Sequence, residues 1–518
     1  MTERLLIGLD AGTTAIKGIL LNESGRILVN TSVEYVLEYP GPDLCEVNPD
    51  VYWKSAVEVI HRLITQSKCN PKNINALAFS SQGETLICID KDGKPLRNAL
   101  VWLDNRSTDE AEILKKTFGE KAVLEITGQP EIIPIWTATK ILWLKRHEKS
   151  LFKKVHKFQL VEDHLVYRLT GKFLTNPSMV TSTLYFNILQ HNWWPDMTGF
   201  LGIDQNKLPE IIKSGQLAGK LTIEAARETG LDKSTLIVSG TYDHAAGAIG
   251  AGNIRAGLVS ETTGTALAMC VTLDKPLLSK KLNLPCHCHA VDGKYYLLPY
   301  GQTAGMVLRW FRDEFCGEEL QVASRDNKNA YELMTSLAEK VPPGSDGLVM
   351  LPHLMGAGSP EFDVRAKGVF AGLTPRMSKG HFIRAIMEAV ASMVKKNLDP
   401  MINFGVKLSE IRALGGGSES DLWNHIKADI TGIPYVTTHS SEAACLGAAI
   451  LAGSGCKVFT SIEDGCTRIV RLNKKYIPDP ANKEAYQKMY QKYIELYDLM
   501  KGWWQENSKN ENRNTKKT

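Results

Sequence analysis

The chain has 518 residues, of which 43% are apolar and 23% charged, so it is long enough for two or more globular domains and too apolar to be disordered. Its 61 basic and 57 acidic residues leave a formal charge of +4, too balanced to indicate a nucleic-acid-binding surface. The N-terminus lacks the features of a secretory signal, and no apolar run approaches the roughly 20 residues of a membrane span. We expect a cytoplasmic protein without nucleic acid or membrane as partner, whose ten cysteines stay reduced.

The first part of the chain alternates between predicted strands and helices. Two apolar runs, residues 5–9 and 16–21, flank a tight turn and predict a hairpin. The elements expected next are a strand over 26–37, a helix over 49–67, a strand ending at 82, helices over 137–148 and 161–170, and a buried strand ending at Asp243. A helix of small residues, "HAAGAIGAG", follows that strand.

The same pattern then starts again. Residues 257–276 predict a strand, a Gly-Thr turn and a strand, as at the N-terminus. A helix over 381–398, a strand over 410–414, three glycines and another helix follow. We therefore predict an α/β fold with two domains of related plan, residues 1–254 and 255–505, and a flexible tail over 506–518, which has no apolar content.

One cluster of metal-binding residue types, Cys286, His287, Cys288 and His289, falls in a predicted strand. Alternation along a strand places the two cysteines on one face and the two histidines on the other. Four donors from one extended segment therefore cannot surround a single ion, and their spacing matches no zinc pattern. We interpret the cluster as structural.

The two Gly-Thr turns, Gly12-Thr13 and Gly264-Thr265, have the composition of phosphate-binding loops. A glycine turn can direct successive backbone N–H groups at one point, and Thr hydroxyls add donors. Either turn alone is better explained by ordinary turn and strand preferences, but two copies favour a polyphosphate held across a cleft between the domains. The first copy has Asp10 where the second has Thr262. Phosphates repel a carboxylate unless a cation separates them, so Asp10 indicates a Mg²⁺ site, reached through water.

A third glycine turn, Gly415 to Gly417, lies between a predicted strand and a predicted helix. Such glycines let the backbone approach a ligand, and the following helix N-terminus favours negative charge. The chain contains no G-x-x-x-x-G-K-[S/T] sequence, which argues against a P-loop. A bound nucleotide is therefore expected to lie between the two hairpins and this turn.

Asp243 ends a buried strand and precedes the helix of small residues. A structural interpretation is an N-cap, a common position for Asp. The functional interpretation is a carboxylate held at a rigid strand end as acceptor for the proton of a substrate hydroxyl. Beside two phosphate hairpins we favour the base, and the two roles are compatible.

Taken together, these stretches resemble the FGGY carbohydrate kinases of the actin-like ATPase superfamily, over about residues 4 to 500. The resemblance includes "GLDAGTTAIKG", "SSQGET", "YDHAAGAIGAG", "TTGTALA" and "GGGSESDLWNHIKADITG". The stretch from Gly368 to Glu388 matches the second signature of the family throughout, whereas Ile135 departs from the first. The resemblance implies two actin-like (ribonuclease H-like) domains with a nucleotide cleft between them, ATP and Mg²⁺ as cofactors, and Asp10 on the magnesium side.

The resemblance also implies roles for individual residues. Asp243 aligns with the catalytic aspartate. The nucleotide-binding positions are Gly12, Thr13, Thr14, Lys17, Gly264, Thr265, Gly305, Arg309, Gly416, Gly417 and Ser420. Arg309 and Ser420 stand where glycerol kinases have glutamine and asparagine.

The expected substrate contacts are Gln82, Glu84, Trp102, Asp104, Asp243 and His244. In this region Gly83, Ile135 and His244 replace the arginine, tyrosine and glutamine of glycerol kinases, and the Met-His-Gly of xylulokinases is absent. The missing arginine is expected to leave room for a larger, uncharged sugar or sugar alcohol.

We therefore expect ATP-dependent phosphorylation of a hydroxyl on a small sugar or polyol, in the manner of a xylulokinase, with Asp243 as general base. The alternatives are a glycerol kinase-like polyol kinase and an actin-like ATPase that phosphorylates no metabolite. The sequence does not decide which sugar or hydroxyl is used, nor any allosteric regulation, and a homodimer is the default expectation for the assembly.

Overall fold

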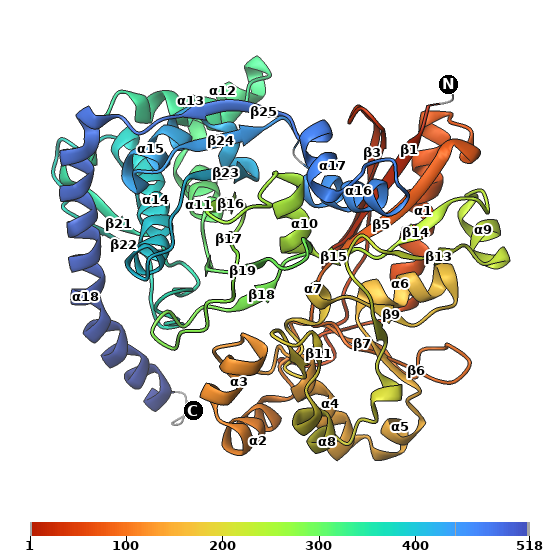
Figure 1. The fold of residues 1–518 in the computed structure, drawn as a ribbon. Helices are drawn as coiled ribbons and strands as arrows, with labels where there is room; N and C mark the ends of the chain where they lie inside the picture. Colours follow the sequence, from red (N-terminus) through yellow and green to blue (C-terminus); the bar gives the residue numbers. More distant parts are fainter. Residues whose placement is uncertain (1–2, 441, 515–518) are drawn as a thin grey trace.

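Two β-sheets organise the molecule, one from each half of the chain (Figure 1). The computed structural model describes residues 3–440 and 442–514. The first sheet contains β13 (Leu217–Lys220), β14 (Leu236–Val238), β5 (Ile74–Ser81), β1 (Leu5–Ala11), β2 (Ala15–Asn22) and β3 (Ile27–Glu34) in that order, with β15 (Thr241–Tyr242) also paired to β5. The second contains β18 (Cys286–Cys288), β19 (Tyr295–Leu297), β17 (Leu267–Leu273), β16 (Leu258–Thr263), β23 (Glu410–Leu414), β24 (Tyr435–Thr438) and β25 (Leu472–Tyr476), with β20 (Tyr300–Gly301) also paired to β17.

The two sheets share one plan. In the first, β2 is antiparallel to β1, whereas β5 and β14 continue parallel to it. In the second, β17 is antiparallel to β16, whereas β23 and β24 continue parallel to it. This duplicated mixed sheet is the actin-like, ribonuclease H-like arrangement. The predicted division at residues 254 and 255 falls in the connection between β15 and β16.

Helices cover both sheets and build the rest of each half. The helices of the first half are α1 (Asp50–Ser67), α2 (Thr108–Phe118), α3 (Glu120–Thr127), α4 (Thr137–His147), α5 (Lys149–Lys154), α6 (Val161–Thr170), α7 (Pro177–Val180), α8 (Pro195–Leu201), α9 (Ile223–Thr229) and α10 (Asp243–Gly250). Those of the second half are α11 (Gly305–Phe315), α12 (Gly317–Asp326), α13 (Ala330–Glu339), α14 (Lys379–Asn403), α15 (Asp421–Thr431), α16 (Ala443–Gly455), α17 (Ile462–Ile469) and α18 (Lys483–Asn514). None of these helices, within the described part of the chain, is long and apolar enough to cross a membrane.

Alternation along β1 explains why an aspartate follows an apolar strand. Leu5, Ile7 and Leu9 pack into one core cluster with α1, whereas Leu6 belongs to the core on the opposite face. Gly8 and Asp10 share the face of Leu6, because side chains of a strand alternate. A Cβ atom at Gly8 would lie 1.9 Å from the backbone oxygen of Cys445 on α16. Asp10 therefore faces α16 and the junction between the two halves.

The helices α10 and α16 join the two halves by close backbone packing. They lie side by side between the sheets in Figure 1, and α16 also packs on β1 and β5 of the first sheet. A Cβ atom at Gly447 would lie 2.0 Å from the backbone oxygen of Ala246, and one at Gly250 would lie 1.9 Å from that of Ala443. The small residues of both helices are therefore required by this contact. It joins α10 of the first half to α16 of the second.

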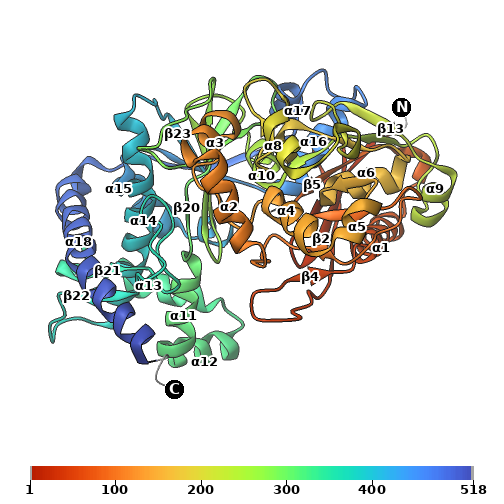
Figure 2. The same ribbon diagram turned by 90° about the horizontal axis from the view of Figure 1, so that it is seen from below.

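Two predictions differ from the structure. The buried strand ending at Asp243 is interrupted: β14 ends at Val238, and β15 begins at Thr241 after Gly240, where a Cβ atom would lie 1.8 Å from the backbone oxygen of Phe79. Residues 506–514 of the predicted tail are helical and continue α18 along the outer edge of the second half (Figure 2). Extending an anchored helix adds a hydrogen bond for each residue fixed, so no apolar face is needed there. Residues 515–518 lie outside the described residues.

The α10–α16 contact predicts the effect of adding one methyl group. Gly447→Ala should lower the free energy of unfolding by about 1–3 kcal/mol, because the new Cβ overlaps the backbone of α10. Gly247→Ala is the matched control in α10, since no atom lies within 4 Å of its added Cβ; it should be neutral or stabilising by roughly 0.5–1 kcal/mol. Urea denaturation of both variants measures the difference, and equal stabilities would contradict the account of this contact.

Candidate active site

Two carboxylates come together where parallel strands of the first sheet end. Asp10 on β1 is in register with Ser80 on β5, and Ser80 is in register with Thr241 on β15. Asp243 follows β15 directly and begins α10. Ser80 Oγ donates to Asp10 Oδ1 at 2.6 Å, and the His244 amide donates to Asp243 Oδ1 at 2.6 Å. Carboxyl ends of parallel strands in an open α/β sheet are where ligands bind, and both acids lie there.

The electrostatics of this pair are unfavourable without a ligand. Burial raises the pKa of Asp243 to about 7. Burial also raises the pKa of Asp10 to about 6, and the neighbouring Asp243 adds to that shift, while the Ser80 hydroxyl and Lys17 oppose it. The Asp243 side chain nevertheless keeps 34% of its surface accessible. The site therefore presents two crowded carboxyls, one of which is open to an incoming molecule.

The first hairpin is fixed from behind by side chains of the first half. The Gly12 carbonyl between β1 and β2 accepts hydrogen bonds from the Tyr35 hydroxyl and from Gln82 Nε2, the latter at 3.1 Å. Trp102 Nε1 donates to Thr13 Oγ1 at 3.0 Å. This oxygen accepts a bond from Trp102, so the side chain of Thr13 is held in place. The hairpin thus has the shape of a rigid cradle of donors.

Lys17 leaves the hairpin on β2 and lies 3.3 Å from Glu442, which precedes α16. The two side chains are 48% and 21% exposed, so this pair contributes little to stability. The pair holds the ammonium group of Lys17 beside Asp10 through a contact with the second half of the chain.

The second hairpin forms one wall of a cavity of about 690 Å³. The amide of Gly305 donates to the carbonyl of Gly264 at 2.8 Å, so the start of α11 is tied to the hairpin. Seven of the predicted nucleotide positions line this cavity together: Gly264, Thr265, Gly305, Arg309, Gly416, Gly417 and Ser420. Its size falls within the usual range for a pocket that binds a cofactor or drug-sized ligand.

A buried ion pair supports this hairpin from below. Lys427 Nζ on α15 contacts Glu261 Oε2 at 2.9 Å and donates to Thr263 Oγ1 at 2.6 Å, and both charged side chains are fully buried. A Cβ atom at Gly417 would lie 2.5 Å from Thr263 Cγ2. A Cβ atom at Gly415 would lie 2.8 Å from the backbone oxygen of Thr263, so the glycine turn packs directly against this residue of the hairpin, which explains these two glycines. Ser420 caps α15 by accepting from the amide of Trp423 at 3.3 Å.

Glu84 has the strongest sign of a missing ligand. It is 5% exposed, its backbone φ is 58°, and its Oε1 has no hydrogen-bond partner. Burial raises its pKa to about 7. The fully buried Lys140 on α4 donates from Nζ to the carbonyls of Glu84, at 3.1 Å, and Ile135, at 2.8 Å. Lys140 therefore fixes the strained turn, and the carboxyl of Glu84 is left free for a ligand.

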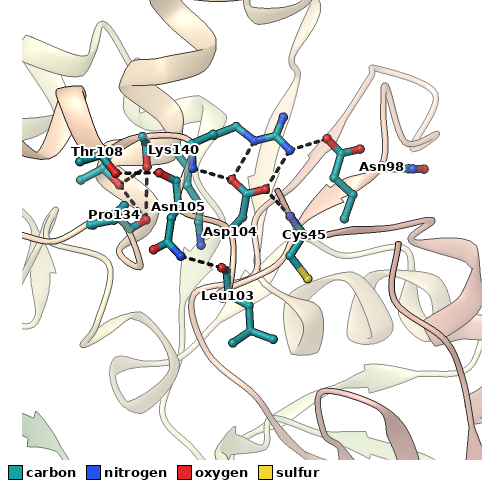
Figure 3. Close-up of polar contacts among 12 residues, drawn as sticks. Cys45, Asn98, Leu103, Asp104, Asn105, Thr108, Pro134 and Lys140 are labelled. Atoms are coloured by element: carbon teal, nitrogen blue, oxygen red, sulfur yellow. Dashed lines mark hydrogen bonds and ion pairs between the residues drawn. The ribbon is translucent and has the colours of Figure 1, made fainter. Parts of the chain in front are cut away.

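Asp104 does not have the expected role as a sugar contact. It is fully buried, and Figure 3 shows its carboxylate turned toward the amide of Cys45. Oδ2 accepts from that amide at 2.7 Å and from Arg106 at 2.8 Å, while Oδ1 accepts from Arg106 Nε at 2.7 Å. Both oxygens are occupied by a bidentate ion pair, which is a strong and geometrically fixed contact. Asp104 is a structural residue.

Gln82 and Gly83 also differ from expectation. Gln82 donates to Gly12 and to the Tyr52 hydroxyl and is 3% exposed, so its amide supports the first hairpin. The space beside Gly83 is not left open for a larger sugar: a Cβ atom there would lie 2.7 Å from Cε2 of Tyr242. The ring of Tyr242 fills that space.

The comparisons with known proteins agree with this geometry. Two models of the FGGY family of carbohydrate kinases match the chain, the N-terminal domain over residues 5–250 and the C-terminal domain over residues 259–456. The chain belongs to this family. It is an ATP-dependent sugar kinase with the two-domain actin-like fold.

The relatives of this kinase are named for different substrates. The chain is 29% identical over 496 residues to a xylulose kinase of Staphylococcus xylosus, and the match covers 95% of this chain and 99% of the relative. It is also 29% identical over 499 residues to a gluconokinase of Bacillus subtilis, covering 96% of each. The crystal structure of xylulose kinase from Rhodospirillum rubrum superposes with a TM-score of 0.88 at 26% identity, over 97% of this chain and 100% of that one.

Sequence analysis missed several residues of the kinase site. Glu162 accepts from the amide of Gly240 at 2.6 Å and thereby supports the turn that leads to Asp243. No local pattern marks Glu162, because its partner Gly240 lies 78 residues away in the sequence. Asn329 and Tyr331 at the start of α13 line the same cavity as the predicted nucleotide-binding residues, and no local pattern marks them.

The position of Lys140 predicts a selective loss of activity. Lys140→Met should lower kcat/KM for the sugar by about tenfold or more, because two buried carbonyls lose their donor and the turn carrying Glu84 relaxes. Lys145→Met is a matched control on α4, since Lys145 also donates to a carbonyl, that of Phe200, at 2.7 Å. Steady-state kinetics should show an unchanged KM for ATP in both variants. Equal effects of the two substitutions on the sugar would contradict this role.

Proposed function

We propose that this kinase transfers the γ-phosphoryl group of ATP to a hydroxyl of a small sugar or polyol, in the manner of a xylulose kinase. Asp243 acts as general base, Glu84 accepts a substrate hydroxyl, and Asp10 lies on the magnesium side. The observation that carries the proposal is the carboxyl of Asp243: it is partly accessible, begins α10, and has its pKa raised to about 7 by burial. A base with such a pKa accepts a hydroxyl proton well at neutral pH.

The residues at the edge of the first sheet fit Mg²⁺. Asp10 and Asp243 repel each other, and a cation between them and a triphosphate would remove that cost. No group of three or more potential ligands that could hold a metal is found among the described residues. A site with only one or two carboxylates fits Mg²⁺, which usually binds one or two carboxylates together with phosphate oxygens and water. When bound, Mg²⁺ neutralises charge that develops on the transferred phosphoryl group.

The hairpins and the substrate side chains account for the remaining steps. Backbone amides and Thr hydroxyls at Thr13, Thr14 and Thr265 hold the phosphates, while Gly416 and Ser420 border the adenosine end. Asp243 orients the acceptor hydroxyl in line with the γ-phosphorus and takes its proton. Because the transition state of phosphoryl transfer is loose, this positioning supplies most of the acceleration.

Glu84 favours a sugar kinase over an ATPase that acts on no metabolite. Its buried Oε1 lacks a partner, and a buried carboxylate oxygen without a partner is costly. A substrate hydroxyl supplies the missing donor. An ATPase switch would have no use for this group.

The test of the proposed base is Asp243→Asn. Sugar-dependent release of ADP should fall by at least about 100-fold, because the amide cannot accept the proton, while sugar binding measured by thermal shift persists. Asp274→Asn, which removes an exposed carboxylate paired with Lys294, should keep full activity. ATP turnover that needs no added sugar and survives Asp243→Asn would refute the kinase mechanism.

The raised pKa of the base predicts a pH dependence. Asp243 is active as the carboxylate, so kcat/KM for the sugar should rise with pH and level off above about 7, the value to which burial raises its pKa. The same direction follows from Glu84, whose pKa burial also raises to about 7. Initial rates measured from pH 5 to 9 at constant ionic strength give the profile. A plateau that already begins near pH 4 or 5 would contradict the assignment.

A further inference from the structure

A row of four aromatic and imidazole rings crosses from the catalytic base into the second half of the molecule. The ring of Tyr242 meets His244 edge-on at 5.1 Å and stacks on His287 at 5.8 Å. His287 on β18 stacks in turn on Tyr296 of β19 at 5.2 Å, its cross-strand partner. The row therefore begins beside Asp243, in the first half, and ends in the second sheet.

Three residues in this region carry buried polar atoms that have no hydrogen-bond partner. Both ring nitrogens of His287 lack one, as do the hydroxyl of Tyr296 and Oε1 of Glu84. The side chains are 1%, 0% and 5% exposed, respectively. Leaving a buried polar group unpaired costs about 1–3 kcal/mol, so a neutral histidine with two such nitrogens is an expensive residue to keep.

The neighbouring histidine shows what a purely structural residue looks like here. His289 shares the face of His287, since both rings contact Tyr296, as strand alternation predicts. The ring of His289 is fully engaged: Nδ1 accepts from the amide of Val291 at 3.0 Å, and Nε2 lies 3.2 Å from the carbonyl of Asn253. The structural interpretation of the Cys-His cluster therefore holds for His289 and does not account for His287.

The unpartnered groups lie near the catalytic carboxyl: burial, and then the neighbouring Cys270, Asp243 and Glu84, raise the pKa of Tyr296. The ring of Tyr242 covers Gly83, the residue before Glu84. Cys270 on β17 contacts the carbonyl of His244 at 3.5 Å, which brings the second sheet against the start of α10. His287 and Tyr296 thus approach, from the second half of the chain, the site whose other side carries Glu84 and Asp243.

We propose that His287 and Tyr296 complete the sugar site, and that they bind an uncharged hydroxyl or carbonyl at the end of the substrate remote from the transferred phosphoryl group. The inference rests on the proposed function and names its substrate class: a neutral ketose or polyol long enough to reach from Asp243 to the second sheet. A sugar acid is excluded as the preferred substrate.

The charges around the site support a neutral substrate. The carboxyls of Glu84 and Asp243 would repel a carboxylate placed beside them. Burial lowers the pKa of His287 to about 3, so its ring is neutral at pH 7 and offers one donor and one acceptor. The ammonium group of Lys140 already donates to two backbone carbonyls. Neutral donors and acceptors beside stacked rings suit hydroxyl groups and the C–H faces of a sugar.

The test uses His287→Phe and Tyr296→Phe, which keep the rings and remove the unpartnered atoms. Each should raise KM for the best neutral substrate among xylulose, ribulose, erythritol and glycerol by about tenfold, with KM for ATP unchanged. Without sugar, the thermal midpoint of both variants should equal or exceed that of the parent, because a buried group with no partner has been removed. The midpoint shift produced by the sugar should shrink. Tyr493→Phe is the matched control, since Tyr493 on α18 also has a buried hydroxyl without a partner.

Gluconate provides the second arm of the experiment. Its kcat/KM should be at least 100-fold below that of the best neutral substrate. Preference for gluconate, or a sugar KM within twofold of the parent in both variants, overturns the inference while leaving the kinase assignment intact. If neutral sugars raise the thermal midpoint of the parent and not of His287→Phe, yet none supports ADP release, the proposed function fails and the binding site stands. If no neutral sugar shifts the midpoint of the parent, the binding site is refuted.

Discussion

The close packing of α10 against α16 is the constraint on which the rest of the structure depends. The two helices touch through glycine and alanine, with no room for a further methyl group at Gly250 or Gly447. Since α16 comes from the second half and also packs on β1 and β5, this contact sets the position of the second half relative to the first sheet. Asp243 begins α10, and Asp10 is the last but one residue of β1, on which α16 packs. The packing therefore fixes both carboxyls relative to the hairpins.

Charge explains why a site with this packing needs its ligands. Burial raises the pKa of both Asp10 and Asp243, and the two acids work against each other. On the opposite side, the nucleotide cavity is lined by backbone turns and by the hairpin above the buried Lys427–Glu261 pair. Acids at one edge and amide donors at the other suit a triphosphate with a divalent cation between them and an alcohol on the far side. In the proposed mechanism, base chemistry belongs to the first half and phosphate binding mainly to the second.

The sequence could predict what local pattern determines. Apolar runs and glycine turns predict the two hairpins, β5 and β23. The order of these elements predicts the repeated plan of the two halves. Residues that act over long sequence distances could not be predicted. Lys140 reaches Glu84, Tyr242 fills the space beside Gly83, and His287 meets Tyr242, in each case through contacts that no local spacing encodes. The expected sugar contact of Asp104 overlooked both its ion pair with Arg106, two residues along the chain, and its bond from the amide of Cys45, 59 residues away.

A crystal structure of the kinase with Mg²⁺, a non-hydrolysable ATP analogue and an accepted neutral sugar would test the central claim most directly. The account predicts the acceptor hydroxyl within hydrogen-bond distance of the carboxylate of residue 243, in line with the terminal phosphorus, and the phosphates between the two Gly-Thr turns. A sugar bound with no group near that carboxylate, or phosphates lying outside the two turns, would contradict it.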